Sequence, residues 1–165
     1  FPIADESNPS IENVMETSKV DVVWKYNDGN WQTYNPDKPA DKNDFSKVEG
    51  GVGYLVEVSE KFTLAPNVDN IKSDMLSSTK VYEGWNLVGQ YQEYNQDANG
   101  DSALDSLGTE HLGDIYTQDT GLSATKPVSK TSGYLKTGNA YWVSIHGDLS
   151  GGYMSYIESD SVPVK

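Results

Sequence analysis

The strongest constraint on the fold is an internal match between the two halves of the chain. Segments Val48–Val58 and Leu135–Ile145 align without a gap, and the elements around them follow the same order in each half. We therefore predict a duplicated unit, with a first copy at residues 1–79 and a second at 80–165, packed as one compact body. The matched positions are Val48/Leu135, Gly51/Gly138, Tyr54/Tyr141, Val56/Val143 and Val58/Ile145.

Strand patterns dominate both copies, because β-branched and aromatic residues recur between turn residues. Asn27–Asn30 is a hairpin-type turn. Short helices are predicted at Ser10–Thr17 and Ser102–Leu112. The predicted fold class is mainly β, a β-sandwich or two packed small sheets from a duplicated unit, with two short helices. The predicted strands are Val20–Tyr26, Trp31–Tyr34, Gly53–Val58, Gly84–Gly89 within the segment Lys80–Tyr91, Asp114–Thr117, Ala140–Ile145 and Tyr153–Ile157.

Charge excludes some partners. The 165 residues include 25 acidic and 12 basic ones, all of them lysine, for a formal charge of -13. Such a field repels phosphate and anionic lipid, so we expect no nucleic-acid partner and no membrane insertion. It attracts cations, although acidity that serves only solubility remains the alternative. The absence of cysteine excludes disulfides and thiolate metal sites.

An acidic loop after residue 96 predicts a calcium site. Hard cations take oxygen ligands at alternating positions of such loops, as in dockerin-like and thrombospondin-type calcium loops, which this stretch resembles. Ser102 stands where the tight turn prefers glycine, and Gly108 stands where a bidentate glutamate would complete the site. The alternative is an Asx-rich turn that caps the following helix. The candidate ligands are Asp97, Asn99, Asp101 and Asp105.

No catalytic motif is found, so we expect a protein that is not an enzyme. His111 and His146 are far apart in the sequence and belong to no HExxH or nucleophile pattern. We interpret both as polar surface residues. A second acidic cluster lies among lysines and is interpreted as a solvated loop; it consists of Asp37, Asp41, Asn43 and Asp44.

Exposed aromatic residues offer a second type of function, carbohydrate binding by stacking on sugar rings. The candidates are Trp31, Tyr34, Tyr91 and Tyr94, with Tyr153 as a further one. Tryptophans at other positions lie in apolar strand contexts and are predicted to belong to the core; these are Trp24, Trp85 and Trp142.

The order of these motifs resembles repeats of secreted archaeal and bacterial surface proteins, including S-layer-associated ones. The resemblance rests on Gly84–Gly89, Trp24, Tyr26, Trp31, Tyr34, Gly51, Gly53, Tyr54 and Tyr141–Val143. It covers most of the chain and implies a secreted or cell-surface β-rich module with a structural or adhesive role. It implies no catalytic residues.

Against that pattern, Phe1–Ile3 looks like the end of a strand whose first half is absent. The first copy would then have an open sheet edge that pairs with Tyr153–Val164 or with a neighbouring subunit. Alternatively, the gap reflects only where the sequence begins. We therefore expect a structural or adhesive surface protein, which forms a filament or lattice through strand edges with calcium. Its expected partners are itself or other surface proteins, and glycans in the alternative.

Overall fold

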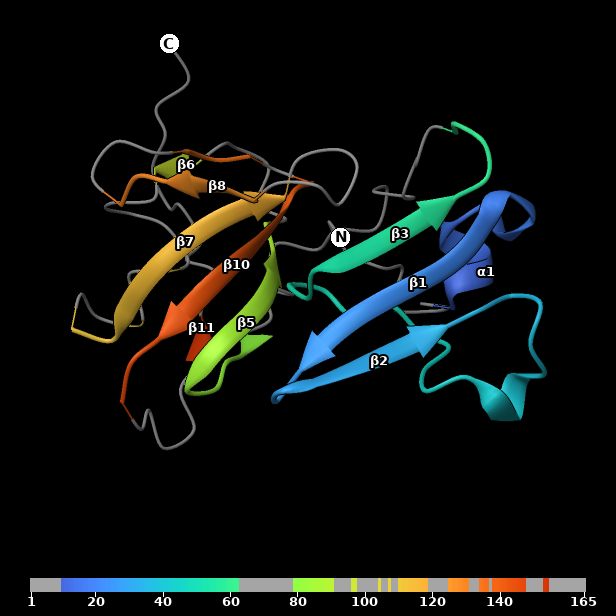
Figure 1. Ribbon diagram of the computed structural model, residues 1–165, viewed down its shortest axis with the longest axis horizontal. Helices are drawn as coiled ribbons and strands as arrows, with labels where there is room; N and C mark the ends of the chain where they lie inside the picture. Colours follow the sequence, from blue (N-terminus) through green and yellow to red (C-terminus); the bar gives the residue numbers. More distant parts are fainter. Residues whose placement is uncertain are drawn as a thin grey trace, which may run out of the picture.

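The computed structural model describes residues 10–62, 79–90, 96–97, 104, 107, 110–118, 125–130, 134–136, 138–147 and 153–154. The fold is mainly β, with two antiparallel sheets, as predicted (Figure 1). The first sheet has the order β2-β1-β3 and consists of Val20–Asn27 (β1), Asn30–Tyr34 (β2) and Tyr54–Val58 (β3). The second has the order β5-β10-β7-β8 and consists of Gly84–Gly89 (β5), Leu112–Gln118 (β7), Thr125–Val128 (β8) and Ala140–Ile145 (β10).

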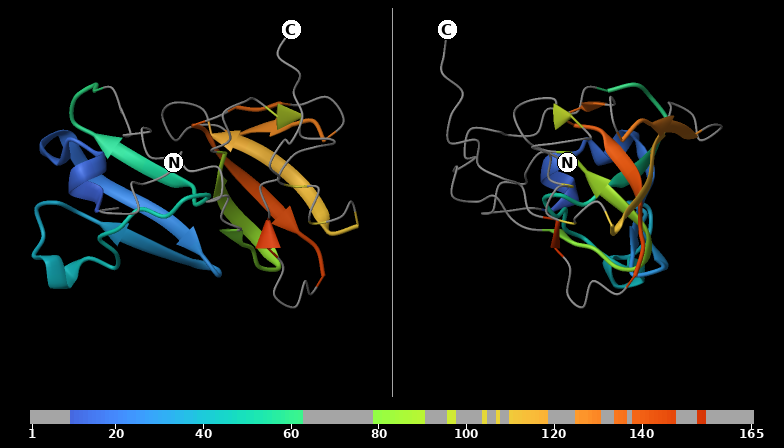
Figure 2. Two further views of the ribbon diagram at one scale, coloured as in Figure 1. Left: turned by 180° about the vertical axis from the view of Figure 1, so that it is seen from behind. Right: turned by 90° about the vertical axis from the view of Figure 1, so that its left-hand side faces the viewer.

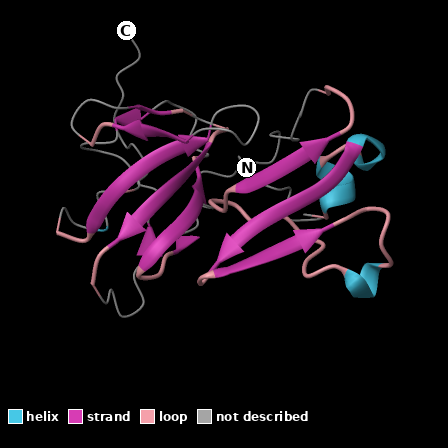
Figure 3. Ribbon diagram, in the orientation of Figure 1, coloured by secondary structure: helices cyan, strands magenta, loops and turns pink. Residues whose placement is uncertain are grey.

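Two short strand pairs and three short helical segments complete the described elements. The pairs are Thr79–Lys80 (β4) with Tyr153–Met154 (β11), and Gln96–Asp97 (β6) with Tyr134–Leu135 (β9). The helical segments are Ile11–Val14 (α1), Thr17–Lys19 (η1) and Ala40–Lys42 (η2), coloured cyan in Figure 3.

The predicted helices differ from the observed ones. The helix expected at Ser10–Thr17 is a single turn, because the backbone of Met15 is already extended, with φ -127° and ψ 146°. The helix expected at Ser102–Leu112 falls largely outside the described residues. Its last residue, Leu112, instead opens strand β7 and pairs with Ile145. At that position pairing within the sheet overrides the helical pattern.

Each sheet has its own hydrophobic core on one face. Ile11 and Met15 of the N-terminal segment cover the first sheet, whose buried residues include Val23 and Tyr34. Leu104 and other residues cover the second sheet, whose buried residues include Val88, Ile115, Tyr141, Val143 and Ile145. Successive side chains of a strand point to opposite faces, so the residues between these core positions lie on the other face of each sheet.

The strands of the two sheets pair in the same pattern. Val23 on β1 pairs with Val56 on β3, and Ile115 on β7 pairs with Val143 on β10. In both sheets the pairing shifts by one residue shortly before this point, which places a bulge at the same position. The strand-leading glycines also correspond, with φ 76° at Gly51 and 83° at Gly138. The positions aligned in the sequence thus occupy equivalent places in the two sheets; the duplication itself stays a prediction.

A buried tyrosine hydroxyl holds the loop before the strand in both sheets. The backbone N–H of Glu49 donates to Tyr54 Oη at 2.8 Å, and that of Lys136 donates to Tyr141 Oη at 2.6 Å. Each bond reaches back five positions along the chain. Because both rings are buried, each loop N–H gives a tyrosine hydroxyl a hydrogen-bond partner in place of water.

These tyrosines predict a loss of stability at alkaline pH. Burial raises the pKa of both Tyr54 and Tyr141 above the ordinary value. The unfolded chain ionises near pH 10 while the folded chain keeps the protons, so stability falls as pH rises above about 10. Urea unfolding followed by circular dichroism over this range should show the loss. The double variant Tyr54→Phe/Tyr141→Phe should show a shallower decline, and equal slopes would contradict the assignment.

Strand β5 joins the two sheets, which lie side by side (Figures 1 and 2). One edge of β5 pairs with β10 along its whole length. On the other edge, the N–H of Gly53 donates to the carbonyl of Leu87 at 3.0 Å, and the N–H of Gly89 donates to the carbonyl of Gly51 at 2.8 Å. Val52 and Val88 form the antiparallel bridge between these bonds. We call this junction the seam.

Candidate functional site

The predicted calcium loop lies almost wholly outside the described residues. Asp97 is described only as backbone, where it pairs with Tyr134 in the β6–β9 ladder. Asn99, Asp101 and Asp105 fall outside the described ranges. Among the residues that are described, no group of three or more His, Cys, Asp or Glu is arranged to hold a metal ion. Calcium binding stays a prediction.

The four predicted stacking residues have different outcomes. Trp31 is exposed, with 49% of its surface accessible. The expected exposure of Tyr34 is wrong: it is 5% exposed and packs in the first core. Trp31 and Tyr34 are three positions apart on one strand, and side chains alternate between faces, so the two residues lie on opposite faces of the sheet. Tyr91 and Tyr94 lie outside the described residues.

An open depression of about 560 Å³ lies where side chains of the two sheets meet, and its lining is mostly aromatic. We call it the aromatic surface. The first sheet contributes two side chains, and the second contributes four. In chain order the lining residues are Tyr26, Trp31, Trp85, Tyr116, Thr125 and Trp142.

The rings of this surface form two contacting groups. Tyr26, Trp31 and Trp142 contact one another edge-on, with centroid distances of 5.2 Å for Tyr26–Trp31, 5.3 Å for Tyr26–Trp142 and 5.7 Å for Trp31–Trp142. Trp85 and Tyr116 form the second group at 5.7 Å. Edge-to-face contacts at these separations stabilise the rings against one another.

A scan of protein-family models and searches of curated proteins and of solved structures returned no match to this chain. The geometry of the site therefore carries the functional argument. Within the part of the chain that the structure describes, no helix has the length and apolarity needed to cross a membrane.

Strand alternation explains why large apolar side chains reach this surface. On β10, Tyr141 and Val143 point into the second core, so Trp142 between them points to the opposite face. Trp142 pairs with Tyr116 on β7, which puts both rings on the same side of the sheet. The predicted core position of Trp142 is only partly met, because its ring is half-buried among aromatic neighbours.

The core position predicted for Trp85 is wrong, since 43% of its surface is exposed. Its neighbour Asn86 takes the inward position on β5 and is 7% exposed. The Asn86 side chain makes three hydrogen bonds there: its Nδ2 donates to the carbonyls of Tyr82 at 2.7 Å and Gly84 at 3.2 Å, and its Oδ1 accepts from the Tyr82 N–H at 2.9 Å. Because neighbouring residues of a strand point to opposite faces, the inward position of Asn86 places Trp85 on the outer face.

The face that carries the aromatic residues has no lysine on the strands of the two sheets. Their two lysines, Lys25 and Lys126, occupy register positions of the opposite face, opposite Tyr54 and Thr117. An acidic residue, Glu57, shares the outward face of β3 with Leu55. The surface therefore offers aromatic rings in a field that is neutral to negative.

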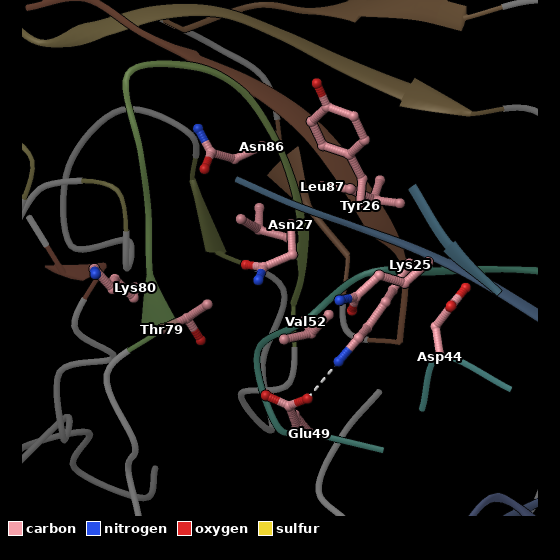
Figure 4. Close-up of a pocket in the computed structure, with 12 residues that line it drawn as sticks. Lys25, Tyr26, Asn27, Asp44, Glu49, Val52, Thr79, Lys80, Asn86 and Leu87 are labelled. Carbon is pink, nitrogen blue, oxygen red and sulfur yellow. Dashed lines mark hydrogen bonds and ion pairs between the residues drawn. The ribbon is translucent and has the colours of Figure 1, made fainter. Parts of the chain in front are cut away.

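A second hollow, of about 220 Å³, is polar and lies beside the end of β1 (Figure 4). Lys25 Nζ donates to Glu49 Oε1 at 2.6 Å and lies 4.9 Å from the ring centre of Phe45. Lys80 and Asp44 also line this pocket. The two lysines and two carboxylates balance in formal charge, so we interpret the ion pair as structural. The remaining lining residues include Asn27, Gln32, Val52, Thr79 and Asn86.

The Lys25–Glu49 pair predicts an asymmetric response to substitution. The Lys25 side chain is 10% exposed, whereas that of Glu49 is 59% exposed. Glu49→Gln leaves a largely buried ammonium without its carboxylate and should cost about 1–3 kcal/mol in urea unfolding. Lys25→Met keeps the apolar stem and leaves only a solvated carboxylate, so it should cost less than about 1 kcal/mol. A larger loss for Lys25→Met would contradict this account.

The outer edges of the two sheets are protected. Asp44 Oδ2 accepts from the N–H of Thr33 at 2.8 Å, and the Asp44 N–H donates back to the Thr33 carbonyl at 3.0 Å. The Thr33 hydroxyl donates to the same Oδ2 at 3.1 Å, and the two hydrogen bonds that the Asp44 carboxylate accepts from Thr33 lower the pKa of Asp44. The loop expected to be merely solvated therefore closes part of the β2 edge. On the other outer strand, β8, Pro127 has no N–H to donate.

The two histidines lie together although they are far apart in the sequence. The His146 N–H donates to the His111 carbonyl at 2.9 Å, and His111 Nδ1 lies 2.9 Å from the His146 carbonyl oxygen. Because a carbonyl only accepts, Nδ1 carries the proton in this bond. The pair connects the start of β7 to the end of β10, which is a structural role.

Proposed function

We propose that this chain is a non-catalytic module of a cell surface or extracellular assembly that binds carbohydrate through the aromatic surface. The single observation that carries the proposal is the exposure of Trp31 and Trp85 at 49% and 43%, on one open depression with three further aromatic rings. Exposed apolar groupings of this kind mark sites of interaction.

Sugar rings fit such a surface because their C–H faces are apolar while their hydroxyls stay in water. Tryptophan offers a large apolar area with little side-chain entropy to lose, which suits stacking without deep burial. The strands of the two sheets place no lysine on this face, which fits a ligand recognised by shape more than by charge. The resemblance to repeats of secreted surface proteins supports a location outside the cell.

Self-association remains the rival function. Protection of the β2 and β8 edges argues against strand pairing there. In this rival function the exposed rings of the aromatic surface contact a second chain. Calcium belongs to the proposal only as a prediction for Asp97, Asn99, Asp101 and Asp105, and the double variant Asp97→Ala/Asp101→Ala tests it by calorimetry with calcium.

Trp31→Ala tests the carbohydrate proposal. We expect an affinity loss of about 1–3 kcal/mol, roughly five- to 150-fold, because one stacking ring is removed. Binding to a panel of soluble polysaccharides is measured by affinity electrophoresis, and circular dichroism checks the fold. Val58→Ala is the matched control, since Val58 is 39% exposed and lies outside the surface. Unchanged binding in Trp31→Ala, or light scattering that shows dimers lost in this variant, would favour self-association.

A further inference from the structure

The aromatic surface is built by both copies at once. Tyr26 and Trp31 come from the hairpin of the first sheet, and Trp142 comes from the central strand β10 of the second. Their mutual contacts, at 5.2–5.7 Å between ring centres, join the two contributions into one group. Neither copy alone presents this arrangement.

The seam fixes the two contributions relative to each other. Backbone hydrogen bonds of Gly53 and Gly89 connect the first sheet to β5. The approach at Gly53 is close: a Cβ there would lie 2.7 Å from Leu87 Cγ and 3.1 Å from Ala140 Cβ. Since these contacts leave little room for one sheet to shift against the other, the rings are held in position before a ligand arrives.

The aromatic surface presents two groups of rings rather than one. The group around Trp142 and the group of Trp85 and Tyr116 both line the same depression, of about 560 Å³. A chain of several sugar units can contact both groups at once. Charge also limits the ligand, because the described strands place no lysine on this face and the whole chain carries a formal charge of -13. Carboxylated or sulfated sugars would be repelled.

We propose that the two copies form one composite site, from Trp31 to Trp85, for a linear polysaccharide without acidic groups. This rests on the proposed carbohydrate function and adds its ligand class and its stoichiometry. A chain of sugars would lie across the seam and contact rings from both sheets in a single binding event. Each copy contributes part of the affinity, and removal of either part weakens the whole.

The test is isothermal titration of the full chain with hexasaccharides of glucose, mannose, xylose and N-acetylglucosamine. The glucose disaccharide and hexagalacturonate are the length and charge controls. We expect one bound neutral hexasaccharide per chain, at least tenfold weaker binding of the disaccharide, and no binding of hexagalacturonate. Trp31→Ala and Trp85→Ala should each weaken the hexasaccharide about tenfold with the stoichiometry unchanged, and Val58→Ala should match the unmodified protein.

The outcomes separate this inference from the proposed function. Two hexasaccharides per chain, with each tryptophan variant losing one site and keeping the other at full affinity, would overturn the composite site while leaving carbohydrate binding intact. Equal or tighter binding of hexagalacturonate would overturn the ligand class. No binding of any neutral hexasaccharide would overturn both proposals. Because both tryptophans are half exposed, loss of folding is checked by circular dichroism, and Trp31→Phe and Trp85→Phe should keep part of the affinity.

Discussion

Replacement of Ile145 by alanine is expected to lower the free energy of unfolding by about 2–5 kcal/mol. Ile145 is 1% exposed and lies in the second core at the end of β10. The truncation leaves a cavity under strands that pair on both of its sides, so the surroundings can relax only partly. Urea unfolding followed by tryptophan fluorescence and circular dichroism measures the change.

The chain itself supplies the matched control for this experiment. Val58 occupies the equivalent register position in the first sheet and is 39% exposed. Val58→Ala should therefore cost less than about 1 kcal/mol, mainly through strand propensity. Similar losses in free energy of unfolding in the two variants would mean that burial does not distinguish these equivalent positions. That result would contradict the assignment of Ile145 to a core.

Gly53→Ala is expected to destabilise the protein by about 1–3 kcal/mol through overpacking at the seam. The φ angle of Gly53 is not in the left-handed region, so the expected loss is steric: the new methyl would meet Leu87 Cγ at 2.7 Å and the Leu87 carbonyl carbon at 3.1 Å. The seam should open before either core is lost. Fluorescence and circular dichroism should then report different urea midpoints.

A double-mutant cycle with Leu87→Ala provides the control for Gly53→Ala. Removal of Leu87 Cγ creates space next to the new methyl, so the two losses should sum to more than the loss in the double variant, by about 0.5 kcal/mol or more. Additive losses, or a single shared midpoint in Gly53→Ala, would argue that Gly53 does not control the junction.

The fold class could be predicted because the alternation of side chains in a strand and the residues that favour a turn are local features of the sequence. The Asn27–Asn30 turn corresponds to a hairpin, the alternation in Ala140–Ile145 to the central strand β10, and the aligned Val48–Val58 segment to the strand β3. Gly51 and Gly138 were aligned from letters alone, and both adopt a positive φ that favours glycine. The shared tyrosine bonds to Glu49 and Lys136 follow from the same alignment.

The aromatic surface could be predicted only in part. Exposure of Trp31 was expected, but Trp85 was assigned to the core, because an apolar context in the sequence does not show which face of β5 is covered. Asn86 could have indicated the orientation of β5, since an asparagine side chain can turn inward to hydrogen-bond the backbone of a neighbouring turn. The meeting of Trp31 with Trp142 depends on how two sheets pack, which neither segment encodes alone.

The place of β5 at the seam also has a consequence for biosynthesis. The first sheet is complete in its own three strands once residue 58 has left the ribosome, yet the strand that docks beside Gly51 and Gly53 is translated later. Until then the nascent chain exposes backbone groups at that junction. Docking therefore waits until β5 has been translated, so the seam forms after the first sheet during co-translational folding. A ribosome stalled before residue 84 would carry the first sheet with the backbone groups of Gly51 and Gly53 still without β5.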